Sequence, residues 1–362
     1  MLNAMDPITH FMTGACLGRA GFNRKAAYAT LAMTLAAEAP DLDVLWLFKG
    51  PVPAFEHHRG WTHAFIGLPL EAGAVVGVVW LIHRWRMRRG NAADQQSHVA
   101  RGPVAPVRWG LLYLFSLIAL LSHILLDWTN NYGVRPFFPF NPRWYSGSIV
   151  SVIEPVMFGL LLMGLVAPAL FGLVGSEVGA RKPVYRGRSW AIFALVAIVA
   201  LWGWRWVERQ KALDLARAAD YDGAQVLRVD ANPHFINPFR WQTIAETPMF
   251  YQISSADTLN GTMATNPQAG LFHKPPTTLA TLVAKRSWLG RVYLDWSKYT
   301  LVTETTTDED GLTAVTFRDL RFIMSDTPLQ RGGREDPPLS GVVYINSDRR
   351  VDHMTMGGRV QR

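Results

Sequence analysis

The stretch WGLLYLFSLIALLSHILLD, residues 109–127, decides the fold, because a long apolar run ends in a histidine and an aspartate. A helix needs roughly 20 apolar residues to cross the hydrocarbon core of a bilayer, and residues 109–126 come close to that length. Ionisable groups in or at the edge of a membrane are costly, and a chain does not keep several of them without compensation. The stretch therefore predicts a membrane-spanning helix that carries His123 and Asp127 at one end.

The rest of the chain divides into a helical and a β-rich part. Two shorter segments, 8–20 and 26–38, predict an N-terminal helical hairpin that is buried against the spans. Three further apolar stretches predict a total of about four spans, and they lie at residues 64–83, 156–174 and 189–207. We therefore expect an α-helical polytopic membrane domain over residues 1–207.

Residues 208–362 resemble a soluble, β-rich domain, which a short helix near 208–219 links to the last span. Alternating polar and apolar residues predict one hairpin from 299–306 and 312–319 and a second from 341–346 and 351–356. The Pro-containing segment 230–240 predicts a loop.

The charge pattern predicts the orientation in the membrane. The chain has a formal net charge of +8, which in a soluble protein would suggest nucleic-acid binding. Here much of the basic charge lies in the loops 84–108 and 175–188, and the positive-inside rule places such loops in the cytoplasm. We therefore expect no nucleic-acid partner. The segments 39–63 and 127–155, and everything after 207, are then expected on the outer side of the cytoplasmic membrane.

This topology brings many histidines and carboxylates to the outer face. His63 begins one span, whereas His123 and Asp127 end the next span, which runs in the opposite direction. His123 and Asp127 are also four residues apart, so they point from one helical face. The candidate ligands that share this outer face are His10, Asp41, Asp43, His57, His58, His63, His123 and Asp127, with Glu38 and Glu154 as outer candidates.

The residue types indicate the chemistry of the site. The chain has a single cysteine, Cys16, so a disulfide within the chain and a cysteine-based zinc site are excluded. Mixed His and Asp ligands suit zinc, manganese or iron better than calcium. We predict one or two divalent ions, with zinc or manganese as the first choice, because more than four ligands would favour a two-metal site.

The same motifs resemble a known family, the membrane-bound, metal-dependent hydrolases of the YdjM type. The resemblance covers residues 5–160 well and implies an inner-membrane location and a hydrolase activity. It also favours His58 over His57 as a ligand. The motifs that carry it are Met5-Asp6-Pro7-Ile8-Thr9-His10, Pro40-Asp41-Leu42-Asp43, His58-Arg59-Gly60-Trp61-Thr62-His63, His123-Ile124-Leu125-Leu126-Asp127, Trp144-Tyr145-Ser146-Gly147-Ser148 and Ile153-Glu154-Pro155.

These observations lead to a functional hypothesis. We expect metal-dependent hydrolysis of an ester or phosphoester at the outer membrane surface, with membrane lipid or a lipid-linked molecule as substrate. Asp43 or Glu154, if not a ligand, could act as the general base. The predicted metal ligands are His10, Asp41, Asp43, His58, His63, His123 and Asp127.

Other interpretations stay open at this stage. His123 could make an interhelical hydrogen bond, Asp41 and Asp43 could be solvated loop residues, and Glu154 could only stabilise a helix N-terminus. Arg59 could pair with a carboxylate or bind an anionic substrate. The protein could be a non-catalytic membrane scaffold whose metal staples the helices while the β domain binds a partner, or a transporter of a divalent ion.

Overall fold

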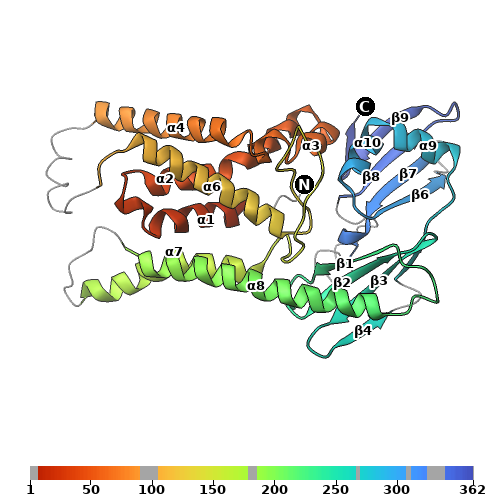
Figure 1. Ribbon diagram of the computed structural model, residues 1–362. Helices are drawn as coiled ribbons and strands as arrows, with labels where there is room; N and C mark the ends of the chain where they lie inside the picture. The colour runs from red at the N-terminus through yellow and green to blue at the C-terminus, as the bar shows by residue number, and fades with distance from the viewer. Residues whose placement is uncertain are drawn as a thin grey trace.

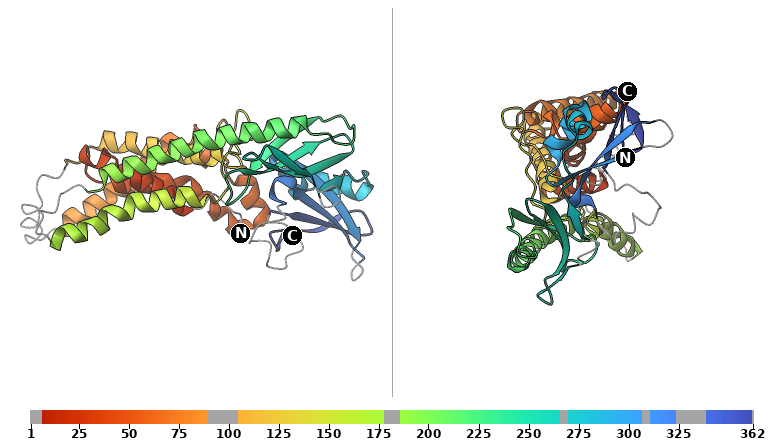
Figure 2. Two further views of the ribbon diagram at one scale, coloured as in Figure 1. Left: turned by 90° about the horizontal axis from the view of Figure 1, so that it is seen from below. Right: turned by 90° about the vertical axis from the view of Figure 1, so that its right-hand side faces the viewer.

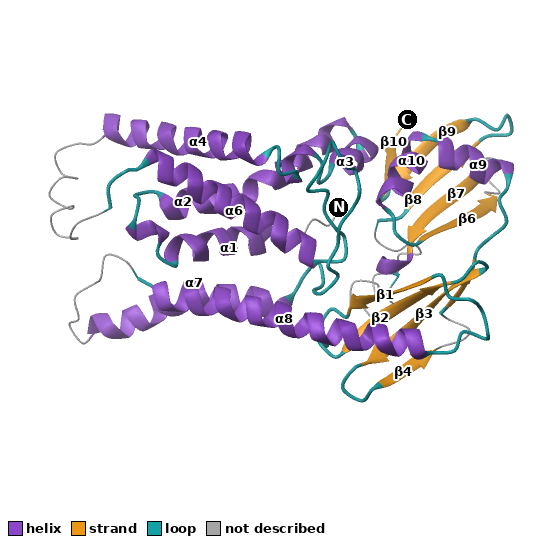
Figure 3. Cartoon of the chain, in the orientation of Figure 1, coloured by secondary structure: helices purple, strands orange, loops and turns teal. Residues whose placement is uncertain are grey.

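The computed structural model describes residues 7–89, 105–177, 186–265, 270–306, 311–323 and 339–361. A bundle of long helices is followed along the chain by a region of two antiparallel sheets (Figure 1, Figure 3). The predicted order, a helical part before a β-rich part, is confirmed. The helices of the bundle are α1 (Pro7–Arg19), α2 (Ala29–Glu38), α3 (Pro51–His57), α4 (Leu68–Arg89), α6 (Trp109–Thr129), α7 (Pro155–Glu177) and α8 (Arg188–Ala218), with the 3₁₀ helices η1 (Phe22–Arg24), η2 (Ala39–Lys49) and η3 (Trp61–His63) between them.

The long helices include candidate membrane spans. Each of the four stretches predicted to span a membrane contains one long helix, α4, α6, α7 or α8. In the described part of the chain, α6 and α8 are long and apolar enough to cross, and Pro51–His63 with Leu68–Arg89 would make a third span, bent by 85°. The apolar part of α7, Pro155–Phe171, is shorter. By length and apolar composition, the described residues therefore contain two or three candidate spans. A fourth span stays a prediction.

The N-terminal helices α1 and α2 pack at very short distance. A Cβ atom placed on Gly14 would lie 2.5 Å from the carbonyl oxygen of Met33, and one placed on Gly18 would lie 2.5 Å from Cα of Thr30. Small residues allow this close approach of backbones in membrane bundles. The contact fixes the start of α1, which carries His10, beside the end of α2.

Helix α8 runs without a break from the bundle into the β region. The predicted short helix at 208–219 is the end of this 31-residue helix. Its second half packs on the first sheet, where Ala212 and Leu213 are buried together with Trp241. Figure 2 shows α8 (green) extending along the bundle and over the sheet. Helix α8 is therefore shared by the bundle and the β region.

The β region contains two five-stranded sheets. The first has the order β1 (Arg228–Pro233), β2 (Arg240–Glu246), β3 (Phe250–Asp257) and β4 (Thr262–Thr265), and β5 (Leu271–His273) also pairs with β3. The second has the order β10 (Arg359–Gln361), β9 (Val351–Met356), β8 (Gly341–Ile345), β7 (Thr313–Asp319) and β6 (Thr300–Thr306), with α9 (Leu279–Arg286) and α10 (Trp288–Trp296) packed on it and η4 (Leu320–Phe322) after β7.

Both predicted hairpins are present, as the pairs β6–β7 and β8–β9. Residues 307–310 of the first turn lie outside the described part. The loop predicted for 230–240 is wrong in its first half, because residues 228–233 form β1. Pro233 is the last residue of this edge strand, a position where the missing N–H costs little.

The second sheet and its helices are packed against the end of the bundle. Val52 and Phe55 of α3 and Tyr132, from the loop after α6, are buried with Trp296 of α10. The indole N–H of Trp296 donates to the carbonyl oxygen of Tyr132 at 3.3 Å. Arg321 donates to the carbonyl oxygen of Asn131 at 2.7 Å. The loop that follows Asp127 is therefore held by the β region.

The close packing of α1 on α2 gives a first prediction. Gly14→Leu should destabilise the bundle by about 1–3 kcal/mol, because the new side chain has no room against α2. The matched control is Gly77→Leu on α4, where a Cβ atom would meet nothing within 4 Å. Thermal denaturation in detergent followed by tryptophan fluorescence measures both. Equal melting temperatures for the two variants would contradict the packing described.

A buried ion pair in the β region gives a second prediction. Burial would raise the pKa of the Asp319 carboxyl, but the Arg321 guanidinium lowers it more, so the pKa lies below its ordinary value. A carboxylate whose pKa is lower in the folded than in the unfolded state stabilises the folded state at pH values above the unfolded pKa of about 4. This stabilisation is lost as the pH falls below that value toward the folded pKa.

We therefore expect the melting temperature to fall from pH 5 to pH 3 by less in Asp319→Asn than in the wild type. Asp319→Asn should already be less stable at pH 7, by about 3 kcal/mol, because it leaves Arg321 buried without its partner charge. Asp214→Asn, at an exposed pair with Arg217, is the control and should behave as the wild type. An unchanged pH dependence in Asp319→Asn would refute the assignment.

Candidate metal centre

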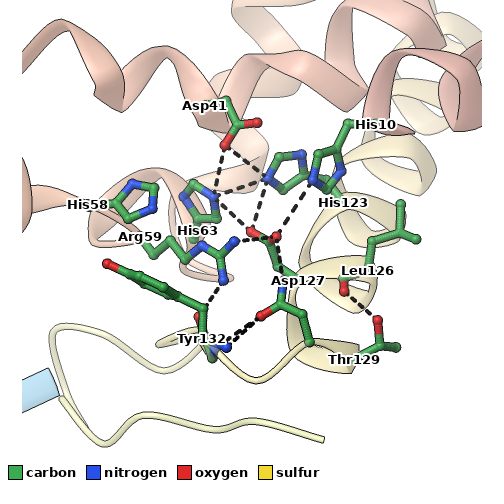
Figure 4. A network of polar contacts seen from close by, with 12 residues as sticks. His10, Asp41, His58, Arg59, His63, His123, Leu126, Asp127, Thr129 and Tyr132 are labelled. Carbon is green, nitrogen blue, oxygen red and sulfur yellow. Dashed lines mark hydrogen bonds and ion pairs between the residues drawn. The ribbon is translucent and has the colours of Figure 1, made fainter. Parts of the chain in front are cut away.

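Five of the predicted ligands lie around one point, where α1, η2, η3 and α6 meet (Figure 4). Four of them are completely buried, and only the side chain of Asp41 is partly exposed, at 12%. The five are His10 from α1, Asp41 from η2, His63 from the end of η3, and His123 and Asp127 from the last turns of α6. Segments far apart in the sequence thus deliver three imidazoles and two carboxylates to one pocket.

His63 and His123 lie close to each other and to the carboxylates of Asp127 and Asp41. His63 Nε2 lies 3.0 Å from His123 Nε2 and 3.2 Å from Asp127 Oδ2. His123 Nε2 lies 3.5 Å from Asp127 Oδ2, and Asp41 Oδ1 lies 3.7 Å from both imidazole nitrogens. Ligand atoms held about 2.0–2.1 Å from a tetrahedral ion are about 3.4 Å apart. His63 and His123, with a carboxylate oxygen of either Asp127 or Asp41, therefore have the spacing of three ligand atoms around one metal ion.

Several buried polar atoms in the pocket lack a hydrogen bond. They include both carboxylate oxygens of Asp41, Oδ2 of Asp127 and both ring nitrogens of His10. Oδ2 of Asp127 is close to His63 Nε2, but the contact does not have the geometry of a hydrogen bond. A buried polar atom without a partner costs about 1–3 kcal/mol, and more when it is charged. Because a cation would satisfy these atoms, the residues fit a divalent ion.

Neighbouring groups outside the cluster orient the imidazole rings of His123 and His63. His123 Nδ1 lies 2.7 Å from the carbonyl oxygen of Ala37, so this nitrogen carries the proton and Nε2 offers its lone pair to the pocket. His63 Nδ1 lies 3.0 Å from Thr62 Oγ1 and 3.6 Å from Asp43 Oδ2. Outer contacts of this kind are typical of histidines that bind metal ions.

Arg59 is part of the same buried network. Its guanidinium donates to Asp127 Oδ1 and to the carbonyl oxygen of Gly133, each at 2.6 Å, and lies 4.7 Å from the ring centroid of Tyr132. Of the two roles considered for Arg59, the structure shows the pairing with a carboxylate. Oδ1 of Asp127 is therefore bound to Arg59 and lies 3.6 Å from His10 Nε2, while Oδ2 faces His63 and His123.

Asp43 and His58 lie next to the five-residue group. Both oxygens of Asp43 are 3.2 Å from His58 Nδ1, and the backbone N–H of Arg59 donates to Asp43 Oδ2 at 2.8 Å. Burial would raise the pKa of the Asp43 carboxyl, but the His58 ring and the N–H of Arg59 lower it more, so the pKa lies below its ordinary value. The structure therefore places an ionised Asp43 behind His63 and beside His58.

Two of the weaker candidates have other neighbours. Glu154 precedes α7 and lies 3.9 Å from Arg205 of α8, which also donates to the carbonyl oxygen of Ile149. His57 stacks on Trp46, with ring centroids 3.8 Å apart.

Some members of the buried polar network around Asp127 were not predicted from the sequence. The carbonyl oxygens of Ala37 and Gly133 were missed because a backbone atom leaves no mark in the residue pattern. Tyr132 was missed because a lone tyrosine in a loop is not distinctive. Glu71, in the first turn of α4, has a buried oxygen without a partner, and its charge interacts with His63 and His123. Its position four residues after Gly67, at the start of a predicted span, was the signal that could have found it.

Together, the apolar helices and the buried His/Asp group define a helical membrane protein with a candidate metal centre and an appended β region. The chain belongs to the YdjM inner membrane protein family, whose model matches residues 5–212. The matched part contains all the residues of the site. This membership confirms the resemblance noted in the sequence and supports a membrane location.

Other comparisons are less informative about function. The uncharacterized protein YfhP of Bacillus subtilis (strain 168) is 25% identical over 162 residues, which are 42% of this chain and 43% of YfhP. The chain thus matches less than half of the length of that relative. No solved structure matches the chain.

The geometry of the site gives a third prediction. The purified wild-type protein should contain a divalent transition metal, and His123→Ala or Asp127→Ala should reduce the content at least about tenfold, because each removes a ligand. His57→Ala is the control, since this ring stacks on Trp46 outside the site. Elemental analysis of protein prepared in parallel measures all four. Equal metal content in the wild type and the ligand variants would exclude the site.

Proposed function

We propose that this protein is a metal-dependent hydrolase that acts on an ester or phosphoester of a lipid or lipid-linked molecule at the membrane surface. The observation that carries the proposal is the cluster at the end of a membrane bundle in which His63 Nε2 and His123 Nε2 lie 3.0 Å apart and each lies 3.2–3.7 Å from a carboxylate oxygen of Asp127 and of Asp41. A transporter is less well supported, because both groups of candidate ligands in the described residues lie at the same end.

The residues of the chain would hold a single ion. The two groups of candidate ligands, His10 with His123 and Asp127, and Asp41 with His63 and His123, both use His123. An imidazole nitrogen has one lone pair, and Nδ1 of His123 already donates to Ala37. We therefore favour one zinc or manganese ion over two, held by three of the four residues Asp41, His63, His123 and Asp127, because a catalytic ion keeps one position open for water.

A bound divalent ion would supply Lewis acidity and would lower the pKa of a water molecule to near 7. Arg59 fixes the orientation of Asp127 through the 2.6 Å contact. Asp43 orients His58, and a histidine oriented by a carboxylate is a common general base. We assign the proton-accepting role to the pair Asp43–His58, and Glu154, which faces Arg205, becomes the weaker candidate for this role.

The proposed location follows from the charge pattern. If the basic loops between the spans are cytoplasmic, the site and the β region lie on the outer side of the cytoplasmic membrane. A metal centre at that level is close to the headgroups and ester bonds of the outer leaflet. This position favours a lipid over a soluble substrate.

One observation favours a second candidate function. All the donor atoms are buried, including both carboxylate oxygens of Asp41, which also suits an ion that only staples α1, η2, η3 and α6 together. In that case the protein would be a scaffold whose β region binds a partner. The two functions differ in whether removal of the metal abolishes a turnover or only lowers the thermal stability.

The proposal is tested with protein reconstituted in lipid nanodiscs and a panel of lipid esters and phosphoesters. We expect turnover that a chelator abolishes and added zinc or manganese restores. Asp43→Asn should retain the metal and lower turnover about 10- to 100-fold, because it perturbs His58 and His63 without removing one of the four candidate ligands. His57→Ala should be as active as the wild type.

Full metal content without turnover on any member of the panel would overturn the hydrolase. If removal of the metal then lowered the melting temperature, the scaffold would be the better description.

A further inference from the structure

The 3₁₀ helix η2 carries an apolar stripe on its outer side. It has 11 residues, whereas 3₁₀ helices longer than about four residues are uncommon. Because such a helix has three residues per turn, residues three apart lie one above the other. Leu42, Leu45 and Phe48 have this spacing, and they are 61%, 55% and 89% exposed. One edge of η2 is thus a continuous row of exposed apolar side chains.

The opposite edge of η2 faces the protein. Pro40 and Asp43 are buried there, and Trp46, on the same edge, stacks on His57. The ammonium group of Lys49 lies 4.5 Å from the centroid of the Trp46 ring. A tryptophan with a nearby lysine is typical of the boundary between lipid and water. The segment therefore has the amphipathic character of a helix that lies at a membrane surface.

The same helix forms the exposed side of the metal centre. Among the five clustered ligands, Asp41 is the only one whose side chain is exposed, at 12%, while His10, His63, His123 and Asp127 are at 0%. Asp41 directly precedes Leu42. The part of the centre nearest to the protein surface is therefore at η2, where both carboxylate oxygens of Asp41 are themselves buried.

The apolar stripe continues the surface of the bundle. η2 packs against α2, α4 and α6, and α6 is a candidate membrane span. Large apolar side chains are also exposed just before α4, at the start of α4 and near the end of α6. They are Phe65, Ile66, Leu70 and Leu125. In a membrane, the same lipid that covers these side chains reaches the stripe. No separate protein partner is needed to cover it.

From this continuity we propose that the stripe of Leu42, Leu45 and Phe48 lies in the acyl chains of the outer leaflet, and that a bilayer lipid reaches the metal centre along η2. The position of the stripe is independent of the hydrolase. The statement that lipid is the substrate class rests on the proposed function. A soluble molecule would have to cross this apolar row, whereas a phospholipid could keep its chains on it and bring its headgroup to the surface beside Asp41.

Site-directed spin labelling tests the position of the stripe. The chain has one cysteine, Cys16, which is buried, so Cys16→Ala provides a background for single labels at Leu45→Cys and Phe48→Cys. The labelled proteins are reconstituted in phosphatidylethanolamine and phosphatidylglycerol vesicles, and power saturation compares collisions with oxygen and with a water-soluble nickel complex. The matched control is Leu259→Cys, an exposed apolar residue of the β region.

We expect the ratio of oxygen to nickel accessibility to be several-fold higher at positions 45 and 48 than at 259. A ratio equal to that at 259 would overturn the proposal, because the stripe would then face water. Low accessibility to both reagents with spin–spin broadening would also overturn it and would indicate a second copy of the chain on the stripe.

A second measurement avoids any effect of the labels on folding. Phe48 replaced by photoreactive benzoylphenylalanine keeps an aromatic side chain and should crosslink to phospholipid on irradiation. A crosslink only to protein would count against a lipid-covered stripe. Metal-dependent turnover is measured on the unlabelled wild type. A lipid-covered stripe with no turnover would refute the hydrolase alone, and a water-exposed stripe in an active enzyme would refute the present inference alone.

Discussion

The structure depends on the burial of one carboxylate, Asp127, at the end of an apolar helix. A charge in this position needs compensation, and the chain provides Arg59 on one oxygen and the imidazoles of His63 and His123 beside the other. Arg59 and His63 come from one segment around η3, whereas His123 and Asp127 belong to α6, so their convergence fixes how η3 and α6 meet. The close packing of α1 on α2 is part of the same arrangement, because it brings His10 against His123 and Ala37 behind it.

The β region takes part in this arrangement. The loop after α6 gives its Gly133 carbonyl to Arg59 and stacks Tyr132 on the guanidinium, while Trp296 and Arg321 hold the loop from the other side. The continuous helix α8 makes a second connection between bundle and sheets. A chain of contacts therefore leads from the second sheet to the candidate metal centre.

The sequence predicted those features that depend on local composition. Apolar runs marked the helices, alternation marked the hairpins β6–β7 and β8–β9, and the i, i+4 spacing marked His123 with Asp127 as a pair. Contacts between distant backbones could not be predicted, since nothing in the pattern pairs Gly14 with Met33 or Gly133 with Arg59. For the same reason the sequence did not separate the five clustered candidate ligands from Asp43 and His58, which lie next to them. The strand β1 was missed because Pro233 is a loop signal unless the strand is known to lie at an edge.

X-ray absorption spectroscopy of the purified protein in nanodiscs tests the central claim most directly. The account predicts a divalent ion with nitrogen and oxygen ligands at about 2.0–2.1 Å, no sulfur ligand, and outer-shell scattering from imidazole rings. In His63→Ala protein that still holds metal, the imidazole scattering per metal ion should be weaker than in the wild type. A spectrum with only oxygen ligands and no imidazole scattering, or protein that holds no more metal than its buffer, would contradict it.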